Sequence, residues 1–275
     1  MKLNKILVLS AVFALSACGG TPTLKAITQE EAAAKAEAIA AAQANIEIGD
    51  FSLVDEVSMI DPTYGAIGQK TVRTLDLEAS YLYQAQISTI AGYEFVTEVT
   101  YYIQDGSLYG VYNEEGVKSY EVAEIPSSLS SYSFVEIMEM LGANPYEGMD
   151  FFCDVMLSEE AINNLYAGFT EEGLAELGCT SGTLEVKSKG EGSLYLKGTF
   201  GMDYSEEGYS INGTMIEEYE WENNLVTKYS TVMDITETYG EEEMVSYMAQ
   251  TQTFSYDVTG TVYPDLSEYT LVQPE

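Results

Sequence analysis

Two long stretches of the chain alternate between apolar and polar residues with the two-residue period of a β-strand. The clearest example covers residues 95–103, where one side of the strand carries Phe95, Thr97, Val99, Tyr101 and Ile103. Asp105-Gly106 follows and is a strong signal for a tight hairpin turn. We therefore predict an antiparallel meander that starts at Phe51, uses 72–90 as one long strand or two, and returns at 108–112 and 117–122.

A second strand-rich block begins near Thr183. Its expected strands cover residues 184–189, 194–202, 209–221 and 225–236, with a turn at Asn223-Asn224 because asparagine tolerates positive φ. Residues 241–243, three glutamates, are expected in a loop or at the start of a short helix. A later alternation of Phe254, Tyr256 and Val258 predicts a strand that ends at Pro264, and 269–272 predicts a short last strand.

Helical patterns lie before and between the two strand blocks. Residues 28–45 begin with a capping box, Thr28 to Glu31, and continue as an alanine-rich helix suited to close packing on a flat sheet. In the insert at about 127–181, apolar residues recur with helical spacing at Phe134, Ile137, Met138 and Leu141. Two further short helices are expected at 158–166 and 170–177, the second stopped by Gly178.

This element order predicts a β-rich α+β fold. We expect one large curved antiparallel sheet, a half-barrel, covered by the N-terminal helix and the central helical insert. Residues 27–275 would then form a single domain that includes the insert. The alternative is two stacked β domains divided near the insert.

The first eighteen residues have the form of a secretory signal. Lys2 and Lys5 precede an apolar run over 6–15 that is shorter than the roughly 20 residues of a membrane-spanning helix. The sequence Leu15-Ser16-Ala17-Cys18 resembles the lipobox of bacterial lipoproteins. The resemblance implies a signal peptide at 1–17, a lipid on Cys18, a tether over 18–26, and an extracytoplasmic protein anchored to the bacterial cell membrane or outer membrane. The alternatives are an ordinary signal peptide with a chance cysteine, or an uncleaved anchor.

The remainder resembles the half-barrel family of periplasmic lipoprotein-localisation carriers and mycobacterial lipid-binding lipoproteins. The likeness rests on the element order, on residues 28–45, on Asp105-Gly106 and on residues 218–225. It implies an incomplete barrel that holds a lipid-like ligand between sheet and helices. Apolar residues of the insert are the expected cavity lining, namely Phe134, Ile137, Met138, Leu141, Phe151 and Phe152.

The composition of the chain disfavours several classes of function. The formal net charge is −34, which disfavours nucleic acid as a partner. Histidine is absent, which removes the usual general base, His-containing triads and His-based zinc sites. We therefore expect no enzyme, no metal and no cofactor. Cys153 and Cys179 form a possible disulfide, because an exported chain can oxidise an even pair; two free thiols are the alternative.

An acidic run surrounds the single tryptophan, Trp221. In a strand, Glu218, Glu220 and Glu222 would share one face, and Tyr219 and Trp221 the other. Three carboxylates on one face can bind Ca²⁺ or act as a glycosidase pair, but a solvated strand face is the expected interpretation. The 22 tyrosines favour a second function class, a non-catalytic interaction or adhesion module with an aromatic surface.

Overall fold

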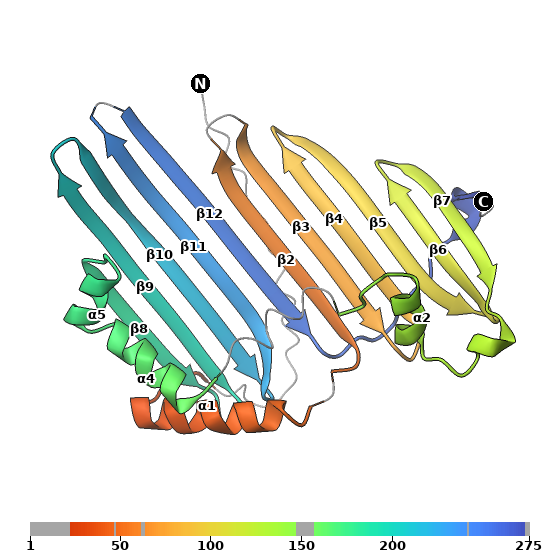
Figure 1. The fold of residues 1–275 in the computed structure, drawn as a ribbon, viewed down its shortest axis with the longest axis horizontal. Coiled ribbons are helices and arrows are strands. Elements are labelled where there is room, and N and C mark those ends of the chain that lie inside the picture. The colour runs from red at the N-terminus through yellow and green to blue at the C-terminus, as the bar shows by residue number, and fades with distance from the viewer. Residues whose placement is uncertain (1–22, 47, 62–63, 147–156, 241, 273–275) are drawn as a thin grey trace.

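The computed structural model in Figure 1 describes residues 23–46, 48–61, 64–146, 157–240 and 242–272. The predicted signal sequence and Cys18 lie outside the described residues, as do Phe151, Phe152 and Cys153. Within the described part of the chain, no helix is long and apolar enough to cross a bilayer.

Thirteen strands form one sheet in the order β1-β8-β9-β10-β11-β12-β2-β3-β4-β5-β6-β7-β13. The strands of the first meander are β2 (Phe51–Asp61), β3 (Gly65–Asp76), β4 (Tyr81–Ile90), β5 (Tyr93–Gln104), β6 (Ser107–Glu114) and β7 (Val117–Glu124). Those of the second are β8 (Ser181–Ser188), β9 (Leu194–Glu206), β10 (Tyr209–Glu222), β11 (Leu225–Tyr239) and β12 (Glu242–Ser255). Two-residue strands, β1 (Lys25–Ala26) and β13 (Thr270–Leu271), close the two edges.

The two meanders join edge to edge rather than stacking. β12 pairs antiparallel with β2, with Phe254 opposite Leu53 and Met248 opposite Met59. Neighbouring strands are antiparallel throughout, except where β13 runs parallel to β7. The predicted fold, one large β-rich antiparallel sheet accompanied by helices, is confirmed, and residues 72–90 contribute to two strands, not one.

Among the described residues, the helical segments are α1 (Gln29–Gln43), η1 (Ser127–Leu129), α2 (Phe134–Met140), α4 (Glu159–Gly168), α5 (Glu171–Glu176) and η2 (Leu266–Glu268). The four predicted helices all form, and the two short 3-10 segments, η1 and η2, were not predicted. Thr28 and Glu31 form the expected capping box on α1, and Ser133 and Glu136 form a second one on α2. α1 buries Ala32 and Ala36, but it packs mainly against α4, and its main contacts with the sheet are at β8 and β9. The short alanine side chains thus serve helix-helix contact more than the helix-sheet contact we predicted.

β12 differs from the prediction at both ends. The expected loop at 241–243 contributes Glu242 and Glu243 to the strand, and β12 ends at Ser255 instead of continuing to Pro264. Because β12 is paired along most of its length with both β11 and β2, it needs no strongly apolar face of its own. Beyond Ser255, side-chain hydrogen bonds replace the ladder, and Tyr256 donates its hydroxyl to the carbonyl of Val226 at 2.8 Å.

The core lies on one face of the sheet and toward one end of its strands. Figure 1 shows α1, α4 and α5 beside β8 and β9, and α2 beside the ends of the central strands of the first meander. The buried sheet residues of this core include Phe51, Leu53, Leu75, Leu82, Leu194, Leu196, Trp221, Val226 and Phe254. The opposite end of the sheet, where β2 ends at Asp61, β4 at Ile90, β9 at Glu206 and β11 at Tyr239, is called the distal end below.

Candidate functional site

A cavity of about 200 Å³ lies between α4 and the core face of β8, β9 and β10. The helix side contributes Leu157, Ala161, Ile162 and Leu165, and the sheet side contributes Leu184, Leu196, Gly198, Phe200, Glu217, Tyr219 and Trp221. The lining is therefore almost entirely aliphatic and aromatic. Pockets of this character, with few polar groups, are the usual form of a small-molecule site.

α4 is held over the sheet by a cap and an apolar side. The hydroxyl of Ser158 accepts a hydrogen bond from the Ala161 amide at 3.0 Å, which fixes the start of the helix. Ile162 is buried, and Leu165 packs against the same core. The helix therefore covers this part of the sheet with its apolar side.

Glu217 is the one carboxyl group in this lining. In β10 it lies on the same face as Tyr219 and Trp221, because residues two apart share a face. Burial raises the pKa of the Glu217 carboxyl above its ordinary value. Burial also raises the pKa of Tyr219, and the nearby charge of Glu217 adds to that shift. The charged form of Glu217 is therefore disfavoured in the unliganded cavity.

Trp221 also lines the cavity under α4. Its side chain is 1 % exposed, and its indole N–H has no hydrogen-bond acceptor among the described residues. The ring stacks on Tyr219 with 5.8 Å between centroids, and Tyr219 in turn contacts Tyr229 at 4.9 Å. An aromatic cluster with one buried donor thus adjoins a half-buried carboxyl group.

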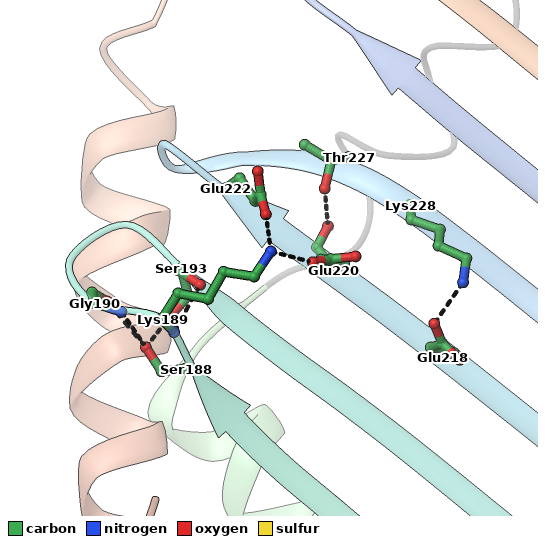
Figure 2. Close-up of polar contacts among 9 residues, drawn as sticks. All are labelled: Ser188, Lys189, Gly190, Ser193, Glu218, Glu220, Glu222, Thr227 and Lys228. Atoms are coloured by element: carbon green, nitrogen blue, oxygen red, sulfur yellow. Dashed lines mark hydrogen bonds and ion pairs between the residues drawn. The ribbon is translucent and has the colours of Figure 1, made fainter. Parts of the chain in front are cut away.

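The other face of β10 carries the remaining acidic run, as predicted from the alternation. Figure 2 shows Lys189 between Glu220, 3.0 Å away, and Glu222, and Lys228 paired with Glu218 at 2.6 Å. Each of these three carboxylates has a lysine partner, which fits the expected solvated strand face. Among the described residues, no group of three or more acidic or cysteine side chains is arranged to hold a metal ion.

The turn before β9 positions Lys189 for these contacts. The hydroxyl of Ser188 donates to the carbonyl of Ser193 at 2.8 Å and accepts from the Gly190 amide at 3.1 Å (Figure 2). The hydroxyl of Ser193 accepts from the Lys189 amide at 3.2 Å. This local network closes the turn, so the Lys189 ammonium reaches across to β10.

A row of methionines continues from the cavity across the sheet. Strand register places five side chains side by side on the core face, in the order Phe200, Met215, Met233, Met248 and Met59. Phe200 lines the cavity, and the four methionines occupy four adjacent strands. They are half-buried, apart from Met59, which is 37 % exposed. With strands spaced about 4.8 Å apart, the row from Phe200 to Met59 is about 19 Å long.

The residues predicted to line a cavity are placed elsewhere or lie outside the described part. Phe134, Ile137 and Met138 are buried in the main core on α2, and Leu141 is exposed. None of them lines the cavity under α4, and Phe151 and Phe152 lie outside the described residues. Cys179 follows α5, but Cys153 lies outside the described residues, so the disulfide stays a prediction.

Substituting Glu217→Gln is expected to stabilise the protein at neutral pH. A carboxyl group with a raised folded-state pKa favours unfolding as the pH rises above the unfolded-state pKa, because the unfolded chain releases the proton more readily. We expect a modest rise of the melting temperature near pH 7, because Glu217 is only half-buried and solvent screens part of its charge. The gain should shrink as the pH falls toward the unfolded-state pKa of about 4.3 and vanish roughly one unit below it, where both states carry a protonated carboxyl group.

Glu218→Gln is the matched control, because Glu218 is the next residue and is paired with Lys228 on the opposite face. It should leave the melting temperature unchanged or slightly lower at neutral pH. Thermal melts of both variants across this pH range make the comparison. A pH-independent shift for Glu217→Gln would contradict the burial of its charge.

The chain matches no protein-family model and no curated protein at a significant level of similarity. The functional assignment therefore rests on the fold and the cavity. Together they define a class of protein, an open antiparallel sheet with helices on one face and an apolar cavity between the two.

Proposed function

We propose that this protein is a membrane-anchored extracytoplasmic lipoprotein that binds an apolar or amphipathic, lipid-like ligand between its sheet and its helices. The observation that carries the proposal is the apolar cavity under α4, which continues into the methionine row. A lipid on Cys18 and a short tether would hold this binding site close to the bilayer that supplies such ligands. The proposed binding site is therefore the cavity under α4 and not the α2 residues that the sequence suggested.

The size of the cavity limits what it can enclose. An apolar cavity of about 150 Å³ suffices to bind benzene, whereas drug-sized ligands need about 300–1,000 Å³. A cavity of about 200 Å³ therefore encloses one end of a lipid. The methionine row, about 19 Å long at about 4.8 Å per strand, can carry the rest, since a bilayer leaflet is about 15 Å deep. Methionine suits this use because its flexible, polarisable side chain adapts to an acyl chain.

The single tryptophan makes the proposal testable by fluorescence. Trp221 lines the cavity, so its emission reports on occupancy of this site. Titrating the purified protein with a fatty alcohol should shift that emission saturably. Native mass spectrometry of protein purified from its own host should in addition show a bound small molecule. Protein that is empty by mass spectrometry and shows no saturable change would count against the proposal.

Filling the cavity with Ala161→Leu is expected to weaken binding of the fatty alcohol by about tenfold or more. Ala161 lies on the inner side of α4, so the larger side chain occupies the space that the ligand needs. Ala38→Leu is the matched control, because Ala38 is exposed in the middle of α1 and outside this lining. Fluorescence titration gives the two dissociation constants, and a tenfold ratio corresponds to about 1.4 kcal/mol. Equal affinities would place the ligand outside the cavity.

A second candidate function is a non-catalytic interaction or adhesion module. It is favoured by the apolar side chains exposed near the distal end of the sheet, which include Ile60, Tyr93, Phe95, Tyr204 and Tyr239. Such side chains are typical of surfaces that bind other macromolecules. Substituting several of them with serine would abolish partner binding under this second function and would leave fatty alcohol binding intact under the first.

A further inference from the structure

The cavity contains a carboxyl group without a positively charged neighbour in its lining. Glu217 is the only Asp, Glu, Lys or Arg among the lining residues of the described cavity. Directly across the ladder, β9 contributes Gly198, which has no side chain, and β11 contributes Thr231. Gly198, Thr231 and the aliphatic and aromatic lining residues around this carboxyl group supply no charge to balance its own.

The carboxylates on the opposite face of the same strand are paired with cations. Glu218 and Glu220 lie 2.6 Å and 3.0 Å from lysine ammonium groups. One face of β10 therefore carries carboxylates that are paired with lysines of this chain. On the other face, Glu217 has no Lys or Arg beside it in the described cavity lining. Glu217 is half-buried, and a carboxylate that loses part of its hydration is destabilised unless it is paired with a cation. A positively charged ligand can supply the missing partner of Glu217.

The aromatic rings in the lining favour the same kind of ligand. Tyr219 and Trp221 stack beside Glu217 on the same face of β10, and Tyr229 extends the cluster. Aromatic faces attract ammonium groups, and the attraction grows when water is excluded. A carboxylate or phosphate headgroup would instead meet the Glu217 charge in an apolar environment, where like charges repel strongly.

We propose that the cavity selects an amphiphile whose polar group is a protonated amine, with the ammonium against Glu217 and the rings of Tyr219 and Trp221, and the chain along the methionine row. This inference rests on the proposed function and specifies the ligand class of the same site. The ligand supplies the positive charge that the cavity lining lacks. Fatty acids and acidic phospholipids are poor ligands of this site.

The test compares three probes with the same alkyl chain, dodecylamine, dodecanol and dodecanoate. Each is titrated into the full chain carrying Cys18→Ser, which removes the acyl acceptor, at about 0.15 M salt, where surface charges are screened beyond about 8 Å. Trp221 fluorescence reports binding. We expect dodecylamine to bind about tenfold more tightly than dodecanol, since a charge-assisted hydrogen bond is about twice as strong as a neutral one. Dodecanoate should bind most weakly.

Two neighbouring variants separate the site from general attraction to an acidic protein. Glu217→Gln should remove the preference for the amine over the alcohol, and Glu218→Gln should retain that preference. The inference is overturned if the alcohol or the carboxylate binds as tightly as the amine, or if the preference survives in Glu217→Gln. Dodecanol binding without amine preference leaves the proposed function standing, whereas binding of none of the three probes overturns both.

Discussion

Replacing Phe254 with alanine is expected to lower the free energy of unfolding by about 3–5 kcal/mol, the usual cost of removing a buried phenylalanine. Phe254 is 4 % exposed and lies on β12 opposite Leu53 of β2, at the pairing that joins the two meanders. Because the core spans this joint, both meanders lose the same contacts. Urea denaturation followed by circular dichroism should therefore show one transition, shifted as a whole to lower denaturant concentration.

Phe95→Ala is the matched control for this substitution. Phe95 also lies on the core face, but it is near the distal end of β5 and 45 % exposed. Its replacement should change the free energy of unfolding by less than about 1 kcal/mol. Two separate transitions in Phe254→Ala, with only one of them shifted, would mean that the meanders are independently stable units.

Local signals accounted for most of the elements. The hairpin at Asp105-Gly106 forms as predicted, with positive φ at both residues, and Asn223-Asn224 does the same between β10 and β11. These turns are set by local backbone preferences, which can be recognised in sequence. The helix caps at Thr28 and Ser133 belong to the same category, since a capping box involves only four consecutive residues.

Features that depend on neighbours distant in sequence were harder to foresee. The boundaries of β12 are set by its partners β11 and β2, and its own residues show little alternation. The pairing of β12 with β2 decides between one sheet and two domains, and its residues are about 190 positions apart in the chain. The methionine row likewise exists only in the assembled register, because its members come from separate strands.

The candidate site combines both kinds of information. Alternation placed Glu218, Glu220 and Glu222 on one face, and this placement is confirmed by their lysine partners. The same rule puts Glu217 with Tyr219 and Trp221, and its odd position in the alternation was the available signal for a half-buried carboxyl group on the core face. The sequence could not predict that α4 covers the cavity, because α4 becomes the neighbour of β10 only through the fold. The α2 residues had stronger apolar periodicity, and three of them went to the core instead.

Cys18→Ser is expected to abolish membrane anchoring almost completely. Cys18 lies outside the described residues, so this prediction rests on the lipobox, in which the cysteine sulfur is the acyl acceptor. Serine is nearly isosteric with cysteine but is not expected to accept the lipid. Metabolic labelling with a palmitate analogue should label the wild type and leave the variant unlabelled. The variant should then move from the membrane fraction to the soluble or secreted fraction.

Cys179→Ser provides the control for this final experiment. Cys179 belongs to the folded domain and lies just after α5, so the same substitution there should leave both labelling and fractionation unchanged. Persistent membrane association of unlabelled Cys18→Ser protein would instead indicate that the apolar run over 6–15 stays attached as an uncleaved anchor. In that case the folded domain would still lie at the bilayer. Its distance from the membrane would then be set by residues 16–26 and not by a lipid on Cys18.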